Sequence, residues 1–309
     1  MFVNPSAGAG RAGRKAAVVA AAFRQRNFAV QISETRSAED LRRQASEAIT
    51  RGFTILIAMG GDGTLQALAQ PAVGNAVTLG VIPAGGGNDF AAALGIPGDL
   101  TRAVEIIVRG ESRAIDLMCV RAQAATTPDG AVPGKTTAYY LGGGGVGLDA
   151  EAVQLANVRF AHWPGRLRYV ASALAALRKF SGAEVRVDLV APQPAIIEKR
   201  LLLAALLNTP SFGGGLRVAP DARMDDGLGE VVLLETLRRW EVAALLPRLL
   251  WSGELRTRRA TRLRASRIKI AASVPIKFQG DGEILCATPL EIEVLPGALR
   301  ILAPAMQNS

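Results

Sequence analysis

The feature that most constrains the fold is a glycine-rich loop that recurs after three short apolar segments. The loops are residues 4–10, 60–64 and 83–90, and each follows a run with the composition of a buried strand. Segments with apolar residues at helical spacing separate them. This alternation predicts a parallel sheet covered by helices, in which the carboxyl ends of the strands share one edge. We therefore expect the three loops to face one crevice.

The expected elements divide the chain into a part with alternating strands and helices and a part that is rich in strands. In the first third we expect strands at 2–4, 29–33, 53–59 and 78–82, and helices at 11–26 and 38–50 with Ser37 as an N-cap. From about residue 111 the chain is β-rich, with strands expected at 114–121, 138–141, 184–190, 199–207, 230–234, 267–271 and 289–295 and helical stretches at 166–180 and 237–251. Residues 122–137, which include Pro128 and Asp129, are typical of a long flexible hairpin loop. The first strand begins at Met1 and is short, which suggests a trimmed edge or a start site placed too late.

Composition narrows the class of protein. The 309 residues carry a net charge of +9, which favours an acidic partner: nucleotide phosphates, an anionic bilayer or nucleic acid. The two cysteines, Cys119 and Cys286, and the one histidine, His162, have no zinc-ligand spacing, so a reduced, cytoplasmic protein fits best. Every apolar run is too short to cross a bilayer, so a lipid substrate would be approached from one membrane face.

The loop at 60–64 has the sequence Gly-Gly-Asp-Gly-Thr and carries the strongest chemical signal. Glycines let backbone N–H groups approach a phosphate, and the following helix N-terminus favours an anion. Because Asp62 would repel a phosphate, it more plausibly orients Mg²⁺, a water molecule or an incoming hydroxyl group. The alternative is a plain strand-to-helix turn.

Taken together, the motifs resemble those of the diacylglycerol kinase catalytic family, in particular its bacterial lipid kinase branch, which includes sphingosine and ceramide kinase relatives. The matching segments are NPSAG (4–8), GGDGTL (60–65), IPAGGGNDFA (82–91), GLDA (147–150), Asn208 with APDARMDDGLGEVVLL (219–234), and QGDGEIL (279–285). The resemblance implies an α/β nucleotide-binding domain with a Rossmann-like parallel sheet, followed by a β-sandwich domain. We expect the first at 1–110 plus 296–309 and the second at 111–295.

The same resemblance implies the site residues. ATP would be bound by Asn4, Pro5, Ser6, Ala7, Gly8, Thr35, Gly61, Asp62, Gly63, Thr64, Leu65, Gln66, Gly86 and Asn88. Asp62, Asp89 and Asp116 would form an acidic network beside the phosphates, with Asp62 counted among the catalytic residues. Asp281 and Glu283 would activate the lipid hydroxyl, because phosphoryl transfer needs a carboxylate near the nucleophile. By its residues alone, the 280–283 segment could equally be a hairpin turn.

A structural Mg²⁺ site is also implied, with the Asp226 side chain and the carbonyls of Arg223 and Leu228 as ligands. A plain acidic turn remains the alternative there. The chain departs from the family pattern at Gln66, Ala67 and Gly86, where relatives often carry polar residues, and these differences could weaken nucleotide binding.

Two segments are candidates for contact with a membrane. Residues 256–269 form the densest basic run, and residues 159–179 mix cations with aromatic residues. A solvated strand face and an ordinary packed helix are the respective alternatives, and we expect His162 to be structural or incidental.

The sequence thus predicts a transferase, an ATP-dependent lipid kinase with ATP and Mg²⁺ as cofactors that phosphorylates a diacylglycerol-like or sphingoid lipid. It would be cytoplasmic, would bind the inner membrane face transiently and would not bind nucleic acid; a homodimer is left open. The rivals are an NAD kinase-like phosphotransferase and a catalytically weakened lipid-binding regulatory homologue.

Overall fold

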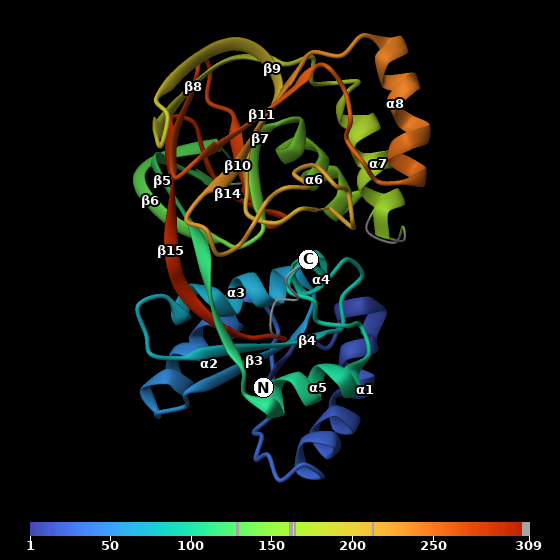
Figure 1. Ribbon diagram of the computed structural model, residues 1–309, viewed down its shortest axis with the longest axis vertical. Coiled ribbons are helices and arrows are strands. Elements are labelled where there is room, and N and C mark those ends of the chain that lie inside the picture. The colour runs from blue at the N-terminus through green and yellow to red at the C-terminus, as the bar shows by residue number, and fades with distance from the viewer. Residues whose placement is uncertain (128–129, 161–162, 164, 212, 305–309) are drawn as a thin grey trace. The chain divides into compact units, whose positions relative to one another are not determined.

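The computed structural model describes residues 1–127, 130–160, 163, 165–211 and 213–304. The chain forms two compact units (Figure 1), unit 1 of Met1–Ile115 with Gly297–Ser309 and unit 2 of Asp116–Pro296. The divisions fall at 115/116 and 296/297, against expected boundaries at 110/111 and 295/296. His162, Pro128 and Asp129, which the sequence singled out, lie outside the described residues.

Unit 1 is built on a parallel sheet. Its strands are β1 (Phe2–Val3), β2 (Ser33–Glu34), β3 (Ile55–Gly60), β4 (Thr78–Pro83) and the end of β15 (Leu290–Leu302), in the order β15-β4-β3-β1-β2. The connecting helices are α1 (Ala7–Arg24), α2 (Ala38–Thr50), α3 (Asp62–Ala72), α4 (Asp89–Ala93) and α5 (Leu100–Arg109). The strands are buried almost throughout, as expected of a sheet packed between helices.

Local signals in unit 1 were mostly sufficient to place its elements. Ser37 caps α2 as predicted, because its side chain accepts a hydrogen bond from the Asp40 amide. The expected strand at 29–33 is wrong in extent: β2 is only Ser33–Glu34, because β1 offers it just Phe2 and Val3 as partners. The α1 segment contains left-handed residues at Gly8, Ala9 and Gly10, so its regular helix starts where the sequence placed it, near Arg11.

Unit 2 is predominantly antiparallel. Its strands are β5 (Ser112–Thr127), β6 (Gly130–Tyr140), β7 (Gly143–Gly147), β8 (Ala183–Ala191), β9 (Ala195–Leu207), β10 (Gly229–Glu235), β11 (Ala260–Ala265), β12 (Arg267–Ala272), β13 (Lys277–Gly280), β14 (Glu283–Ala287) and the first part of β15. One core cluster draws alternate residues from these strands, including Leu206 of β9, Val231 of β10 and Phe278 of β13. The opposite face of β9 and β10 packs in a second cluster that includes Leu203, Leu207 and Leu234.

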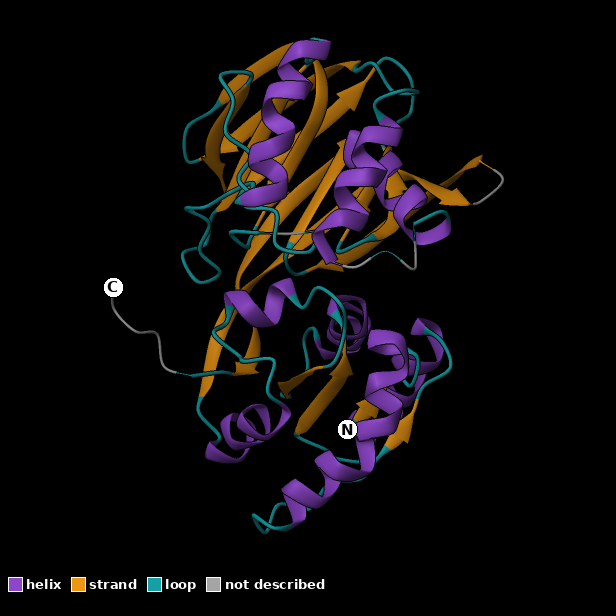
Figure 2. Cartoon of the chain, turned by 90° about the vertical axis from the view of Figure 1, so that its right-hand side faces the viewer, coloured by secondary structure: helices purple, strands orange, loops and turns teal. Residues whose placement is uncertain are grey.

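The described residues of unit 2 form three helices: α6 (Leu148–Val158), α7 (Gly165–Ala176) and α8 (Arg239–Trp251). Figure 2 shows helices lying across one face of the sheet of this unit. The second cluster lies on this side, since Leu177 and Leu249 pack against it. Both helical stretches expected from the sequence are present, although α7 ends four residues before Phe180.

Two expectations for the β-rich region need correction. Residues 122–127 and 130–137 are paired strands rather than loop, because the β5–β6 ladder continues from Ala122↔Thr136 to Thr127↔Gly130. Thr is common in these two segments and favours strands. The basic run at 256–269 includes β11, which the sequence reading missed.

The predicted fold class is confirmed in both halves: a parallel α/β sheet in unit 1 and a β-rich, sandwich-like unit 2. Among the helices of the described residues, none has the length and apolar character needed to span a membrane.

Candidate active site

The three glycine-rich loops of unit 1 are in close contact. A Cβ added at Gly85, in the third loop, would lie 2.4 Å from the Cα of Gly61 in the second loop. A Cβ added at Gly8, in the first loop, would lie 2.1 Å from the carbonyl oxygen of Ala84, and Gly8 has a positive φ of 59°. Both distances are shorter than any real Cβ contact, so glycine is required where the loops meet. The predicted convergence of the three loops is confirmed.

Asp62 holds the second loop to the third. It is the first residue of α3, and its carboxylate accepts hydrogen bonds from the backbone N–H groups of Asp89 (3.2 Å) and Phe90 (3.1 Å) at the start of α4. Burial raises the pKa of Asp62, and these two N–H groups oppose that rise. The carboxylate therefore acts as a brace between the loops, and its predicted catalytic role stays a prediction.

Further hydrogen bonds fix the residues around the loops. Asn88 has left-handed backbone geometry, and its side-chain amide bonds both the N–H and the carbonyl of Gly85 at 3.0 Å. Asn4 donates to the Thr64 hydroxyl at 3.4 Å and accepts from the Ser6 hydroxyl at 2.8 Å. The Thr35 hydroxyl donates to the Val3 carbonyl at 3.1 Å, so this buried side chain lies at the carboxyl end of β1.

The remaining residues that were predicted to bind the nucleotide differ in their exposure to solvent. Gly63 and Gly86 are exposed with open space around them, whereas Leu65 and Gln66 are buried in the first turns of α3. Pro5, Ser6 and Ala7 form the first loop, beside Gly8. The first N–H groups of α3 have no partner within the helix, which makes the exposed end at Gly63 a suitable position for an anion.

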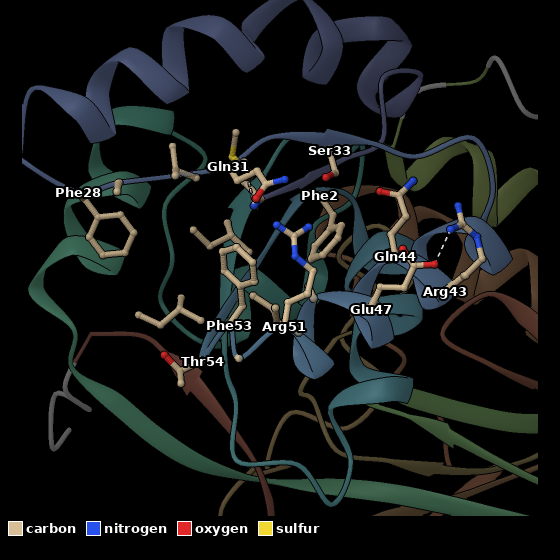
Figure 3. Close-up of a pocket in the computed structure, with 18 residues that line it drawn as sticks. Phe2, Phe28, Gln31, Ser33, Arg43, Gln44, Glu47, Arg51, Phe53 and Thr54 are labelled. Carbon is tan, nitrogen blue, oxygen red and sulfur yellow. Dashed lines mark hydrogen bonds and ion pairs between the residues drawn. The ribbon is translucent and has the colours of Figure 1, made fainter.

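A separate hollow in unit 1 lies away from these loops. It has a volume of about 500 Å³ and is bounded by the segment before β2, by α2 and by the residues that lead into β3, including Gln31, Gln44 and Phe53 (Figure 3). Gln31 accepts a hydrogen bond from the Met1 amino group before β1, and Phe53 precedes β3, whereas the glycine loops follow the carboxyl ends of these strands. None of the predicted nucleotide residues lines the hollow, so we do not assign the nucleotide to it.

In unit 2 the 280–283 segment is a two-residue hairpin turn between β13 and β14. Asp281 and Gly282 both have positive φ, at 51° and 89°, as in a type I′ turn. The Asp281 carboxylate accepts hydrogen bonds from the N–H groups of Leu141 (2.6 Å), Gly142 (2.8 Å) and Gly143 (3.2 Å). Asp281 thereby anchors the turn to the start of β7, while the Glu283 side chain is exposed.

The turn is also held by a buried pair of side chains, Gln279 and Asp149, that sequence reasoning did not identify. Gln279 is fully buried; its side-chain Oε1 accepts a hydrogen bond from the Gly282 N–H at 2.9 Å, and its side-chain Nε2 donates to the Asp149 carboxylate. Burial raises the pKa of Asp149 to about 7, although the hydrogen bond from Gln279 lowers this pKa in part. Asp149 belongs to the GLDA segment, whose partner could not be named from sequence.

The raised pKa of Asp149 predicts a pH-dependent stability. Between the ordinary Asp pKa of 3.8 and about 7, the folded protein retains a proton that the unfolded chain loses, so stability falls as pH rises through this window. From pH 5 to pH 8 we expect wild type to lose roughly 2 to 3 kcal/mol more unfolding free energy than Asp149→Asn. Urea unfolding of both proteins at the two pH values measures this difference, and parallel pH profiles would contradict it.

The proposed structural Mg²⁺ turn is paired with arginine in this structure. Asp226 makes an ion pair with the Arg264 guanidinium and accepts from the Leu228 N–H at 3.1 Å, and Arg223 lies 3.5 Å from Asp225. Among the described residues no group of three or more acidic, histidine or cysteine side chains could hold a metal ion. The predicted set consists of one carboxylate and two main-chain carbonyls, which such a search does not cover. The Mg²⁺ site therefore stays a prediction, in which the ion would compete with the Arg264 guanidinium for the Asp226 carboxylate.

Asp116 lies next to the same turn. It belongs to unit 2 and is buried, and its carboxylate accepts from the Gly227 N–H at 2.7 Å. Asn208, another residue that the sequence only grouped into a motif, donates to the carbonyls of Asp116 (3.0 Å) and Leu141 (2.9 Å). These bonds connect the acidic turn with the segment that anchors Asp281. The predicted acidic network of Asp62, Asp89 and Asp116 stays a prediction.

Unit 2 also contains an apolar cavity of about 150 Å³. Its walls come from all three helices and from the sheet, with Val153 of α6, Leu174 of α7, Leu245 of α8 and Leu203 of β9 among them. Among the described residues of its lining, Asp149 carries the one carboxyl group. The cavity therefore offers apolar surface beside the pair that supports the hairpin turn.

Comparison with known proteins places this arrangement in a family. Residues 1–120 match the family model of the diacylglycerol kinase catalytic domain, and residues 144–303 match that of the YegS C-terminal NAD kinase beta sandwich-like domain. The chain belongs to the diacylglycerol kinase family.

Relatives from this family match most of the chain. It is 29% identical to "Diacylglycerol kinase" of Mycobacterium tuberculosis over 98% of this chain and 94% of that protein. It is 32% identical to "Probable lipid kinase YegS-like" of Stenotrophomonas maltophilia over 86% and 84% of the two chains. A crystal structure of a diacylglycerol kinase from Bacillus anthracis superposes with a TM-score of 0.71 at 18% identity, covering 98% of this chain and 95% of that one, which supports the fold. The resemblance inferred from the motifs is thus confirmed.

Proposed function

We propose that this diacylglycerol kinase family member is an ATP-dependent enzyme that phosphorylates the hydroxyl group of a diacylglycerol-like or sphingoid lipid. The observation that carries the proposal is the apolar cavity of unit 2, which is lined by aliphatic side chains of α6, α7 and α8. An acyl or sphingoid chain is the substrate part that such a surface accommodates. NAD, the acceptor of the rival NAD kinase, is polar and charged and would gain little there.

Unit 1 supplies the groups for the nucleotide. The exposed backbone at Gly63 and Gly86 and the N-terminus of α3 offer N–H groups to the phosphates. Asp62 and Asn88 keep the loops in this conformation through the backbone hydrogen bonds described above. We propose that Mg²⁺ arrives with ATP as part of the co-substrate.

Unit 2 supplies the groups for the acceptor. We assign the general base to Glu283, whose side chain is exposed at the end of the hairpin turn. The lipid hydroxyl transfers its proton to the Glu283 carboxylate while its oxygen forms a bond to the γ-phosphorus; the bond to the β–γ bridging oxygen breaks and ADP leaves with that electron pair. Asp281 is a positioning residue, since three N–H groups occupy its carboxylate.

Membrane contact follows from the acceptor. A diacylglycerol-like lipid stays in the bilayer, and the protein would reach it by transient attachment to the cytoplasmic face. The charge of +9 favours this surface, which carries anionic lipid.

Filling the cavity is the direct test of the acyl-chain assignment. Ala173 of α7 lines the cavity and is partly buried, so Ala173→Phe should occupy space that a long chain needs. We expect kcat/KM to fall about tenfold or more for a long-chain diacylglycerol and to change less than threefold for a short-chain, water-soluble one. Ala175→Phe, also on α7 but absent from the cavity lining, is the control. Equal losses for both chain lengths with Ala173→Phe would contradict the assignment.

A further inference from the structure

Helix α8 carries an apolar stripe on the side that faces solvent. Trp240, Ala244, Pro247 and Trp251 are spaced by four, three and four residues, which places them on one face of the helix. All four are exposed, Trp240 at 63% and Trp251 at 92%. In Figure 1 α8 stands at the periphery of unit 2, beside α7. Two tryptophans exposed along one helix face are unusual unless that face has a partner.

The opposite side of the same helix is apolar as well. Val242, Leu245, Leu246 and Leu249 line the cavity assigned to the acyl chain. A helix at the surface of a water-soluble unit is expected to be polar on its outer face. Packing against unit 2 therefore explains the inner residues of α8 and leaves the outer stripe unexplained.

The charges around the stripe indicate what it contacts. Arg238, Arg239 and Arg248 are exposed at the two ends of α8. The one acidic residue of α8, whose residues are all described, is Glu241; it accepts from the Arg259 guanidinium at 2.9 Å and from the Arg238 N–H at 2.7 Å. Its charge is thus already balanced. A tryptophan stripe flanked by arginines matches the interfacial region of an anionic bilayer, where the indole rings lie at headgroup depth.

The basic run at 256–269 is less suited to this contact. Arg259 pairs with Glu241 and Glu235, Arg264 with Asp226 and Glu230, and Arg267 with Glu291 and Glu293. These pairs reduce the net charge that the run presents to a lipid surface, whereas α8 adds apolar side chains to its cations.

We propose that the outer face of α8 docks on an anionic lipid bilayer, with Trp240 and Trp251 inserted at headgroup depth and Arg239 and Arg248 beside the lipid phosphates. Because the inner face of α8 lines the acyl-chain cavity, docking would bring that cavity next to the membrane. The functional meaning of this contact rests on the proposed lipid kinase activity. The contact itself can be measured without turnover.

The test is sedimentation of the full-length protein with vesicles of phosphatidylglycerol and phosphatidylcholine, and with phosphatidylcholine alone. For Trp240→Ser with Trp251→Ser we expect about tenfold weaker partitioning into the anionic vesicles. Arg239→Glu with Arg248→Glu should lower it by at least as much, and the wild-type partitioning should fall with added salt. Ile196→Ser with Val274→Ser removes exposed apolar side chains, at 63% and 62%, elsewhere in unit 2 and should stay within twofold of wild type. Arg42→Glu with Arg102→Glu on the helices of unit 1 is the charge-matched control.

Two outcomes would overturn the proposal. One is wild-type partitioning of the tryptophan variant. The other is a concentration-dependent wild-type dimer that this variant loses in analytical ultracentrifugation while its vesicle binding is unchanged, which would assign the stripe to a second copy of the chain. Phosphorylation of a short-chain, water-soluble diacylglycerol, measured in parallel, separates this proposal from the proposed function. The tryptophan variant should retain that activity. If wild type phosphorylates neither this lipid nor sphingosine, the kinase assignment is refuted while the docking result stays valid.

Discussion

Glu283→Gln is expected to lower the rate of phosphoryl transfer about 10²- to 10⁴-fold, the usual contribution of a general base. Glutamine has nearly the same shape but cannot accept the proton of the lipid hydroxyl. Because Glu283 is exposed and the hairpin is held by other residues, the unfolding free energy and the affinity for ATP should remain close to wild type. Steady-state transfer of label from ATP to lipid, urea unfolding and nucleotide binding measure the three quantities.

Asp281→Asn is the matched comparison within the same turn. The Asp281 carboxylate accepts hydrogen bonds from three backbone N–H groups, which anchor the turn to the start of β7. The change should therefore weaken this anchoring and lower the unfolding free energy by roughly 1 to 3 kcal/mol, in addition to reducing activity. The assignment of the base would be wrong if Glu283→Gln retained turnover within a few-fold of wild type. It would also be wrong if Asp281→Asn lost all activity at unchanged stability.

Gly85→Ala should weaken ATP binding at least tenfold, the second large effect that the structure predicts. The new Cβ would lie 2.4 Å from the Cα of Gly61 and 2.8 Å from the Oδ1 of Asn88. Because the first of these contacts is with backbone, the two loops would have to separate, and the N–H groups between them would lose their arrangement. Isothermal titration with a nonhydrolysable ATP analogue measures the loss.

Gly86→Ala is the control, one residue along the same loop. A Cβ at Gly86 meets no atom within 4 Å, and its φ is not in the left-handed region, so alanine should change the affinity less than threefold. Similar affinities for the Gly85→Ala and Gly86→Ala proteins would show that close packing of the loops does not shape the nucleotide site.

Sequence patterning predicted the fold well where signals are local. The helix at Ala38–Thr50 and its Ser37 cap lie within a few residues of one another in the chain, and both were found as expected. Elements that depend on a distant partner were less predictable. The strand before Glu34 is short because β1 provides only two residues to pair with, and β5 extends through 122–127 because β6 pairs with it.

The same distinction applies to the candidate site. Glycines and carboxylates could be identified from spacing, but their partners could not. The Gln279–Asp149 pair joins residues 130 positions apart, and the Arg264–Asp226 ion pair at the predicted magnesium turn joins residues 38 positions apart. The family resemblance implies that Asp281 acts with Glu283 as a catalytic carboxylate, but sequence cannot show the hydrogen bonds that Asp281 accepts from three backbone N–H groups.

Transfer of label from [γ-³²P]ATP tests the central claim most directly. The purified protein is incubated with Mg²⁺ and mixed micelles of diacylglycerol, monoacylglycerol, sphingosine or ceramide, with NAD as a water-soluble acceptor in a parallel tube. We predict that label enters an organic-soluble phospholipid product with at least one of the lipids, and that NAD stays unlabelled. Label on NAD alone, or on none of the lipids, would contradict the account.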